Sequence, residues 1–222
     1  MKVAAIVPMR HSSERVKGKN YRNFNSKPLF YWVVKGLLEV EAIDVVYIDT
    51  DSDTIIDLSM KYFPKVKILR RPEELRDGLI SMNDVLLNSL NQINEDVIIQ
   101  THSTNPLISS KTFDRAINQF IDNYPNNDSL FSVTKLHTRL WNEDGTPLNH
   151  NPKVLLRTQD LPPLFEENSC IFIFSKEQFK KTLNRIGENP IMFTTPQLES
   201  VDIDEEADFI IAETLMKINC QV

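Results

Sequence analysis

Apolar, β-branched runs of strand length alternate with longer segments of helical period through the first 134 residues. The runs are "KVAAIVP" (2–8), "DVVYID" (44–49), "VKILR" (66–70), "DVIIQT" (96–101) and "SLFSVT" (129–134). Their nearly continuous apolar character is typical of strands that are buried on both faces. The order βαβαβαβαβ therefore predicts an α/β fold with a doubly wound, mainly parallel sheet and right-handed crossovers.

The intervening segments place Leu, Ile, Val and Phe at helical spacings. They cover residues 27–40, 52–63, 81–93 and 109–124. A serine side chain before a helix accepts a hydrogen bond from a free backbone N–H of the first turn. We therefore expect Ser52, Ser81 and Ser109 to be the N-caps of the last three helices.

The regular alternation ends near residue 135. Short apolar pieces and turn signals fill the following segment, which predicts a β-rich protrusion over 135–165. "CIFIF" (170–174) predicts a return to the main sheet, residues 175–183 a short helix, and residues 205–218 the last helix. Spacing places Ala207, Ile211, Leu215 and Ile218 on one face of that last helix. We expect residues 1–222 to form one domain that carries the protrusion as an arm.

Charge is distributed unevenly along the chain. The net charge is −6, yet residues 1–35 contain eight lysines and arginines against a single acid, Glu14. A local basic patch on an acidic body argues against a general nucleic-acid binder and favours a small anionic ligand. Cys170 and Cys220 are too few for a disulfide framework. The opening apolar run is too short for a signal peptide, and no run approaches the ~18 residues of a membrane helix, so we expect a cytoplasmic protein without a membrane partner.

The cations concentrate in residues 9–22, "MRHSSERVKGKNYR", hereafter the cation loop. Ligands of parallel sheets bind beyond the carboxyl ends of the strands, where this loop lies. Its cations and backbone N–H groups could hold a polyphosphate, although a solvated basic loop remains an alternative. The sequence contains no GxxxxGK[ST], GxGxxG or GxSxG pattern, which excludes the usual ATPase, dehydrogenase and serine hydrolase sites.

Six acids and no base lie between residues 199 and 208, in "ESVDIDEEAD". In an extended segment Asp202 and Asp204 share a face, and they repel each other unless a divalent cation lies between them. Hard oxygen ligands of this kind suit Mg²⁺ or Mn²⁺. The alternative is that Asp204 caps the last helix and Asp202 is merely exposed. The acids of "DTDSD" (49–53) are better explained as a strand end followed by a helix cap than as a calcium loop.

The chain resembles the acylneuraminate cytidylyltransferases over nearly its whole length. Matching residues in the opening segment are Arg10, Ser13, Arg15, Gly18, Lys19, Asn20 and "KPL" (27–29). Further matches follow in order: "IDTDSDTI", "RRPEEL", "HSTNPL", "LPPLFEENSCIFIF" and "SVDIDEEADFIIAE".

The resemblance implies a nucleotidyltransferase with a Rossmann-type sheet. Such an enzyme transfers CMP from CTP to the anomeric hydroxyl of a 2-keto sugar acid of the sialic acid type and releases pyrophosphate, with Mg²⁺ or Mn²⁺ as cofactor. The resemblance also implies a homodimer in which the arm at 135–165 embraces the second subunit. Leu140, Trp141, Leu155 and Leu156 would supply the apolar contact surface.

Site residues follow from the matched positions. Those implied for CTP are Arg10, Ser12, Ser13, Arg15, Lys17, Lys19, Asn20, Arg71, Ser81 and Asn83. Those implied for catalysis are Arg10, Lys19, Asp202 and Asp204, of which Asp202 and Asp204 would hold the metal. Those implied for the sugar are Gln100 or His102, together with Asn168.

Some residues depart from the family pattern. His11 and Ser12 replace two glycines, Glu14 replaces a lysine, Lys17 replaces a proline, and Ser169 with Cys170 replaces Gly-Ala. We expect Glu14 to pair with Arg15, Lys17 or Arg22, of which Lys17 is favoured, or to help hold a metal. Two alternatives therefore stay open: a CMP-Kdo-type synthetase, and a catalytically weak relative that binds nucleotide in a regulatory role.

Overall fold

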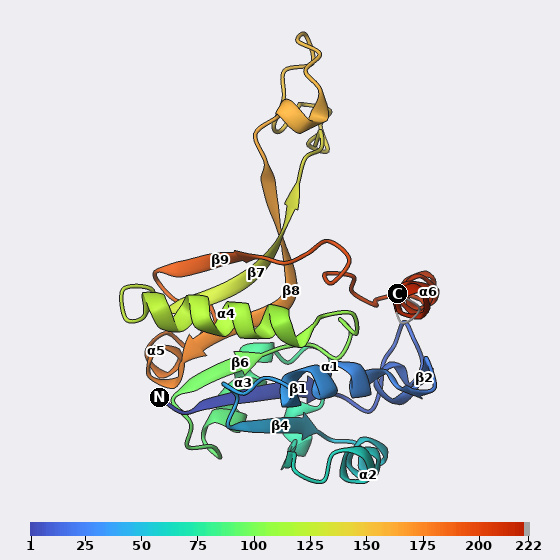
Figure 1. Ribbon diagram of the computed structural model, residues 1–222, viewed down its shortest axis with the longest axis vertical. Helices are drawn as coiled ribbons and strands as arrows, with labels where there is room; N and C mark the ends of the chain where they lie inside the picture. The colour runs from blue at the N-terminus through green and yellow to red at the C-terminus, as the bar shows by residue number, and fades with distance from the viewer. Residues whose placement is uncertain (220–222) are drawn as a thin grey trace.

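A seven-stranded sheet with one antiparallel strand forms the centre of the computed structural model, which describes residues 1–219 (Figure 1). The strand order is β5-β4-β1-β6-β8-β7-β9. The strands are β1 (Val3–Met9), β4 (Val45–Thr50), β5 (Lys67–Arg70), β6 (Val97–Gln100), β7 (Ser129–Leu136), β8 (Leu164–Ser175) and β9 (Pro190–Thr194). All are parallel except β8, which lies antiparallel between β6 and β7. The predicted α/β class and mainly parallel sheet are confirmed.

Within residues 1–219 six α-helices accompany the sheet. They are α1 (Leu29–Leu38), α2 (Asp53–Tyr62), α3 (Met82–Leu90), α4 (Ser110–Asn123), α5 (Lys176–Thr182) and α6 (Glu206–Asn219). Ser52, Ser81 and Ser109 each accept a hydrogen bond from the backbone N–H three residues later, so all three predicted N-caps are confirmed. Short 3-10 turns lie at Lys19–Tyr21, Glu73–Leu75 and Thr158–Asp160, and strands β2 (Asn23–Phe24) and β3 (Lys27–Pro28) form a separate small sheet.

Alternate residues of β1 belong to different halves of the core. Ala5 and Val7 pack in the layer that contains α1 and α4, whereas Ala4 and Ile6 pack in the layer that contains α3 and α5. Every residue of β1 is buried. Burial on both faces explains why the first strand reads as a continuous apolar run, and it makes the sheet doubly wound.

A third apolar cluster joins the two ends of the chain. Its buried members are Val16, Phe24, Leu29, Ile203, Phe209, Ala212 and Met216. The predicted face of α6 is therefore wrong, because Ala207, Ile211 and Ile218 are exposed and Leu215 is only half-buried. The phenyl ring of Phe209 packs edge-on against that of Phe24, with 5.4 Å between ring centroids. The helix thus has two apolar stripes with helical spacing, and the one that contains Phe209, Ala212 and Met216 is buried.

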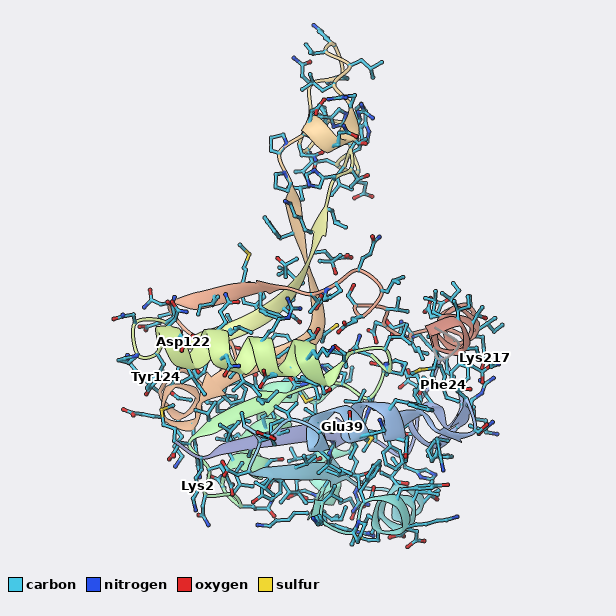
Figure 2. The ribbon with its side chains drawn as sticks, in the orientation of Figure 1. Lys2, Phe24, Glu39, Asp122, Tyr124 and Lys217 are labelled. Atoms are coloured by element: carbon cyan, nitrogen blue, oxygen red, sulfur yellow. The ribbon has the colours of Figure 1, made fainter. Side chains whose placement is uncertain are left out.

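Strands β7 and β8 continue beyond the sheet into a long arm (Figure 1). Their last paired residues are Leu136 and Leu164, and beyond them only the bridge between Trp141 and Pro147 shows strand pairing. The protrusion is thus β-rich at its base and irregular at its tip. Figure 2 shows its side chains projecting away from the main body, and Leu155 is 90% exposed. Among residues 1–219 no helix has the length and apolar composition needed to cross a membrane.

Candidate functional site

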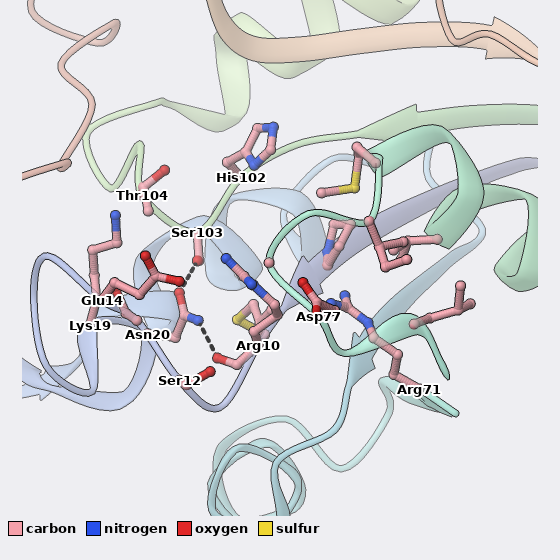
Figure 3. A pocket seen from close by; sticks show the side chains of 18 of the residues that line it. Arg10, Ser12, Glu14, Lys19, Asn20, Arg71, Asp77, His102, Ser103 and Thr104 are labelled. Atoms are coloured by element: carbon pink, nitrogen blue, oxygen red, sulfur yellow. Dashed lines mark hydrogen bonds between the residues drawn. The ribbon is translucent and has the colours of Figure 1, made fainter. Parts of the chain in front are cut away.

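A cavity of about 390 Å³ opens beyond the carboxyl end of β1 (Figure 3). The cation loop, residues 71–85 and residues 102–104 contribute its walls. Eight of the predicted site residues line it: Arg10, Ser12, Ser13, Arg15, Lys19, Asn20, Arg71 and His102. The structure therefore brings most of the predicted nucleotide-binding residues together at the predicted end of the sheet.

Hydrogen bonds fix the cation loop from within. The Asn20 amide nitrogen Nδ2 donates to the Arg10 carbonyl oxygen at 2.7 Å, and the Ser103 hydroxyl donates to Asn20 Oδ1 at 2.7 Å (Figure 3). Gly18 has φ of 63°, and a Cβ atom there would lie 2.8 Å from the Tyr21 ring. Only glycine suits this turn, because an added side chain would meet both backbone strain and the ring.

His11 ties the same loop to the end of β4. Its backbone N–H donates to Asp51 Oδ1 at 2.8 Å, its ring Nδ1 lies 2.7 Å from the Ser52 hydroxyl, and its ring stacks on Tyr21. Residues 49–53 are thus a strand end and a helix cap, as predicted. The imidazole that replaces a family glycine serves as an anchor of the loop.

The two charged constellations of the sequence meet beside this cavity. Arg15 Nη2 lies 2.7 Å from Asp204 Oδ1, and Lys19 Nζ lies 3.6 Å from the same oxygen. Lys19 Nζ also donates to the Ile203 carbonyl oxygen. Val16 and Ile203 are buried in one apolar cluster, which holds both segments in place.

The Asp202 and Asp204 carboxylates lie close enough to influence each other electrostatically. Partial burial and the neighbouring Asp204 carboxylate raise the pKa of Asp202, while a hydrogen bond with Thr104 and the Lys19 ammonium oppose this rise. The Asp204 side chain pairs with Arg15, and Asp208 accepts hydrogen bonds from the backbone N–H groups of residues 204 and 205. The alternative in which Asp204 caps the last helix is therefore wrong.

These two carboxylates suit a hard divalent cation that takes only a few of its ligands from the protein. Two mutually repelling carboxylate side chains can supply oxygen ligands to Mg²⁺, which usually keeps several waters and adds substrate phosphates. No cluster of three or more His, Cys, Asp or Glu side chains suited to a metal occurs in residues 1–219. At Asp202 and Asp204, waters and substrate phosphates would complete the coordination of such a cation.

Arg71 reaches the cavity from a buried ion pair. Its Nε donates to Asp49 Oδ1 at 2.6 Å, and the Ser89 hydroxyl donates to Asp49 Oδ2 at 2.7 Å. Both charged side chains are almost fully buried. A charged hydrogen bond with this little solvent around it fixes the direction of the guanidinium at the cavity wall.

Glu14 lines the cavity without the expected partner. Among residues 1–219 it forms no ion pair, whereas Arg15 pairs with Asp204 and Arg22 pairs with Glu206 at 2.6 Å. The predicted pairing of Glu14 with Arg15, Lys17 or Arg22 is therefore wrong. Its carboxylate approaches Gly78 instead, where a Cβ atom would lie 3.3 Å from Glu14 Oε1 and 2.9 Å from Arg10 Nη1.

The remaining predicted residues lie behind or outside the cavity wall. Lys17 is exposed on the cation loop, and Ser81 caps α3. Asn83 accepts a hydrogen bond from the Arg185 backbone N–H at 3.4 Å, while Met82 beside it lines the cavity. Gln100 is fully buried and contacts His102.

Asn168 lies in a polar junction at the base of the arm. Its Oδ1 accepts hydrogen bonds from the Ser132 hydroxyl and the Cys170 N–H, and its Nδ2 donates to the hydroxyls of Thr134 and Thr195. Both ends of the amide are thus engaged within the protein. This arrangement positions β7, β8 and residue 195 relative to one another.

His102 forms the cavity wall next to Gln100. The two Nε2 atoms lie 3.1 Å apart, and Arg185 Nη1 donates to Gln100 Oε1 at 2.6 Å. Burial, with the nearby Arg185 and Lys19 cations, lowers the pKa of His102 to about 4, so its ring is neutral at pH 7. Sequence reasoning missed Arg185 and also the Asp77 and Gly78 side of the cavity. The charged run after "RRPEEL" was a usable signal for the latter, whereas no motif marks Arg185.

Several proteins similar to this chain are named as cytidylyltransferases of sugar acids. It is 27% identical over 218 residues to N-acylneuraminate cytidylyltransferase A of Danio rerio, covering 95% of this chain and 50% of that protein. It is 26% identical over 233 residues to pseudaminic acid cytidylyltransferase of Campylobacter jejuni, covering 99% of this chain and 98% of that protein. The chain thus spans half the length of the Danio rerio relative.

Solved structures give the same fold. CMP:2-keto-3-deoxy-manno-octonic acid synthetase, solved with CTP, superposes with a TM-score of 0.73 at 16% identity, covering 99% of this chain and 100% of that one. A 4-diphosphocytidyl-2C-methyl-D-erythritol synthase from Anaerococcus prevotii superposes with a TM-score of 0.69 at 13% identity, over 97% of this chain and 96% of that one. The family model described as "Cytidylyltransferase" matches residues 4–214, so the chain belongs to the cytidylyltransferase family of nucleotidyltransferases.

Proposed function

We propose that this protein transfers CMP from CTP to the anomeric hydroxyl of a 2-keto sugar acid and releases pyrophosphate. The observation that carries the proposal is the contact of Arg15 and Lys19 with Asp204, which joins a polycationic loop to a carboxylate pair at the carboxyl end of a parallel sheet. Relatives named for N-acylneuraminate and pseudaminic acid support a sugar acid of the sialic acid type as acceptor.

Catalysis would rest on positioning and on compensation of negative charge. Arg10 and Lys19 would hold the triphosphate, helped by the polar side chains and N–H groups of Ser12, Ser13 and Asn20. Asp202 and Asp204 would hold Mg²⁺ or Mn²⁺, which supplies positive charge to the phosphates and the leaving pyrophosphate. Arg15 and Lys19 hold the Asp204 carboxylate in place.

Arg71 is the candidate for recognition of the cytosine base. Asp49 holds its guanidinium at the cavity wall, and backbone groups near Ser81 and Asn83 would complete the base site. One mismatched donor or acceptor in a buried site costs about 1–3 kcal/mol. CTP should therefore bind at least tenfold more tightly than UTP in a calorimetric titration, and equal affinities would contradict this base site.

The acceptor would bind on the side of the cavity that His102 lines. The neutral imidazole and Gln100 behind it offer hydrogen bonds without placing a second positive charge next to Lys19. Asn168 would act from the base of the arm, through the strands that it fixes.

The arm would bind a second subunit. Leu140, Trp141, Leu155 and Leu156 are all at least partly exposed on it, and apolar side chains gathered on one protrusion indicate an interaction surface. A homodimer is the expected assembly. Light scattering at micromolar concentration measures it directly, and a monomeric mass would contradict the proposed role of the arm.

The decisive experiment follows pyrophosphate release with CTP, Mg²⁺ and a panel of N-acetylneuraminate, pseudaminate and Kdo. Release that requires both CTP and one of the acids supports the proposal and identifies the acceptor. CTP binding without release from any acid favours the regulatory alternative, for which the specific observation is the Glu14 carboxylate in the cavity wall.

A further inference from the structure

Arg185 is a half-buried cation that has no counter-ion among residues 1–219. It follows α5, and its guanidinium lies over the Phe172 ring, with 3.7 Å from Cζ to the ring centroid. Its Nη1 donates to Gln100 Oε1 at 2.6 Å. Of the five N–H donors of its guanidinium, one bonds to the neutral Gln100 amide and none has a carboxylate of residues 1–219 at ion-pair distance.

Burial disfavours the charge at this position. It lowers the pKa of Arg185, and the Glu167 carboxylate opposes that shift only from beyond ion-pair distance. Arg70 and Arg71, by contrast, each have an aspartate partner. A desolvated guanidinium that is held by stacking and by one neutral amide is matched by an anion that arrives from outside the protein.

A chain of contacts connects Arg185 to the cavity. Gln100 Nε2 lies 3.1 Å from His102 Nε2, and His102 lines the cavity wall. Gln100 and Phe172 are paired in register across β6 and β8, so the amide and the ring that orient Arg185 belong to one rigid part of the sheet. The His102 ring is neutral at pH 7 and does not compete for an anion.

We propose that Arg185 binds the carboxylate of the acceptor sugar acid and thereby selects acids over neutral sugars. This inference rests on the proposed function. The planar guanidinium, fixed by Phe172 and Gln100, presents its free N–H groups in the fork that matches a carboxylate. The cation loop supplies separate charges for the phosphates of CTP, so loss of Arg185 would affect the acceptor and spare the nucleotide.

The variant Arg185→Gln removes the charge and keeps a polar side chain. We expect it to raise KM for the acid used by the wild type at least tenfold while the calorimetric Kd for CTP stays within twofold. Arg185→Lys should recover part of the loss. Lys181→Gln is the matched control, because it removes an exposed cation four residues earlier and should leave both constants unchanged.

A second measurement separates carboxylate binding from a merely structural role. Calorimetric titrations without Mg²⁺, on the CTP-loaded protein, compare N-acetylneuraminate, pseudaminate and Kdo with the methyl ester of whichever acid binds. Wild type should bind the acid at least tenfold more tightly than its ester, and Arg185→Gln should bind the two alike. An equal loss for acid and ester, or a KM raised less than twofold, would overturn the inference.

Failure of the proposed function gives a different result. Wild-type protein would then release no pyrophosphate with any acid, whatever residue 185 is. Because the titrations need no turnover, an acid that binds wild type and not Arg185→Gln would still support the assignment. The absence of binding by every acid to wild type would overturn it.

Discussion

Replacement of Asp49 by asparagine should strongly destabilise the protein, although the side chain keeps its shape. The change leaves the Arg71 guanidinium buried without a counter-charge, since the two side chains are 0% and 3% exposed and lie 2.6 Å apart. Removal of one partner of a buried ion pair costs about 3–5 kcal/mol. With a urea m-value of about 2–3 kcal/mol/M, the unfolding midpoint should fall by about 1–2.5 M.

A second Arg–Asp pair in neighbouring positions provides the control. Arg70 and Asp53 lie 2.5 Å apart, but their side chains are 53% and 80% exposed, so solvent screens the interaction. Asp53→Asn should leave the midpoint close to that of wild type. The double variant Asp49→Leu/Arg71→Met, which removes both buried charges, should be more stable than Asp49→Asn. If circular dichroism in urea shows Asp49→Asn no less stable than Asp53→Asn, the reasoning about burial is refuted.

Four further substitutions test the site. Gly78→Ala would place a Cβ atom 2.9 Å from Arg10 Nη1, so the flexible end of the Arg10 side chain must move. Calorimetry should show CTP binding weakened several-fold, while the urea midpoint stays unchanged. Full CTP affinity would contradict the role of Arg10. Asp202→Asn and Asp204→Asn should each abolish most turnover with an unchanged circular dichroism spectrum, and near-full activity at low millimolar Mg²⁺ would contradict the metal assignment. His102 has a pKa of about 4 in the folded protein against the ordinary 6.5, so the unfolded chain binds its proton first. Acidification through that window should lower the free energy of unfolding by up to about 3 kcal/mol, and His102→Gln should remove this contribution; NMR titration of the ring that finds an ordinary pKa would exclude it.

Most of the fold could be predicted because local periodicity reports burial directly. The strands that are buried on both faces read as apolar runs, and three serines marked helix starts. Strand β9 was not predicted, although "PIMF" is apolar, because it is short, begins with a proline and lies at the sheet edge with most of its residues exposed. The buried face of α6 depended on Phe24, a residue nearly two hundred positions away, which no local pattern contains.

The candidate site divides in the same way. The cation loop and the pair at Asp202 and Asp204 stand out in the sequence because like charges are concentrated there. The predicted partner of Glu14 was wrong because the prediction rested on the three cations near it in the sequence. In the structure its side chain approaches Gly78, which belongs to another segment of the chain. Arg185 could not be recognised from the sequence, because the residues that orient its guanidinium, Phe172 on β8 and Gln100 on β6, are close to it only in the folded protein.

The apolar cluster that joins Val16 to Ile203 and α6 also sets an order of events during synthesis. The ribosome delivers the cation loop well before the segment that holds it, because the Arg15–Asp204 contact spans 189 positions. The strands and helices between them can pair as they emerge, because their contacts are closer in sequence. On the nascent chain the cation loop therefore lacks its third core cluster until α6 has been made.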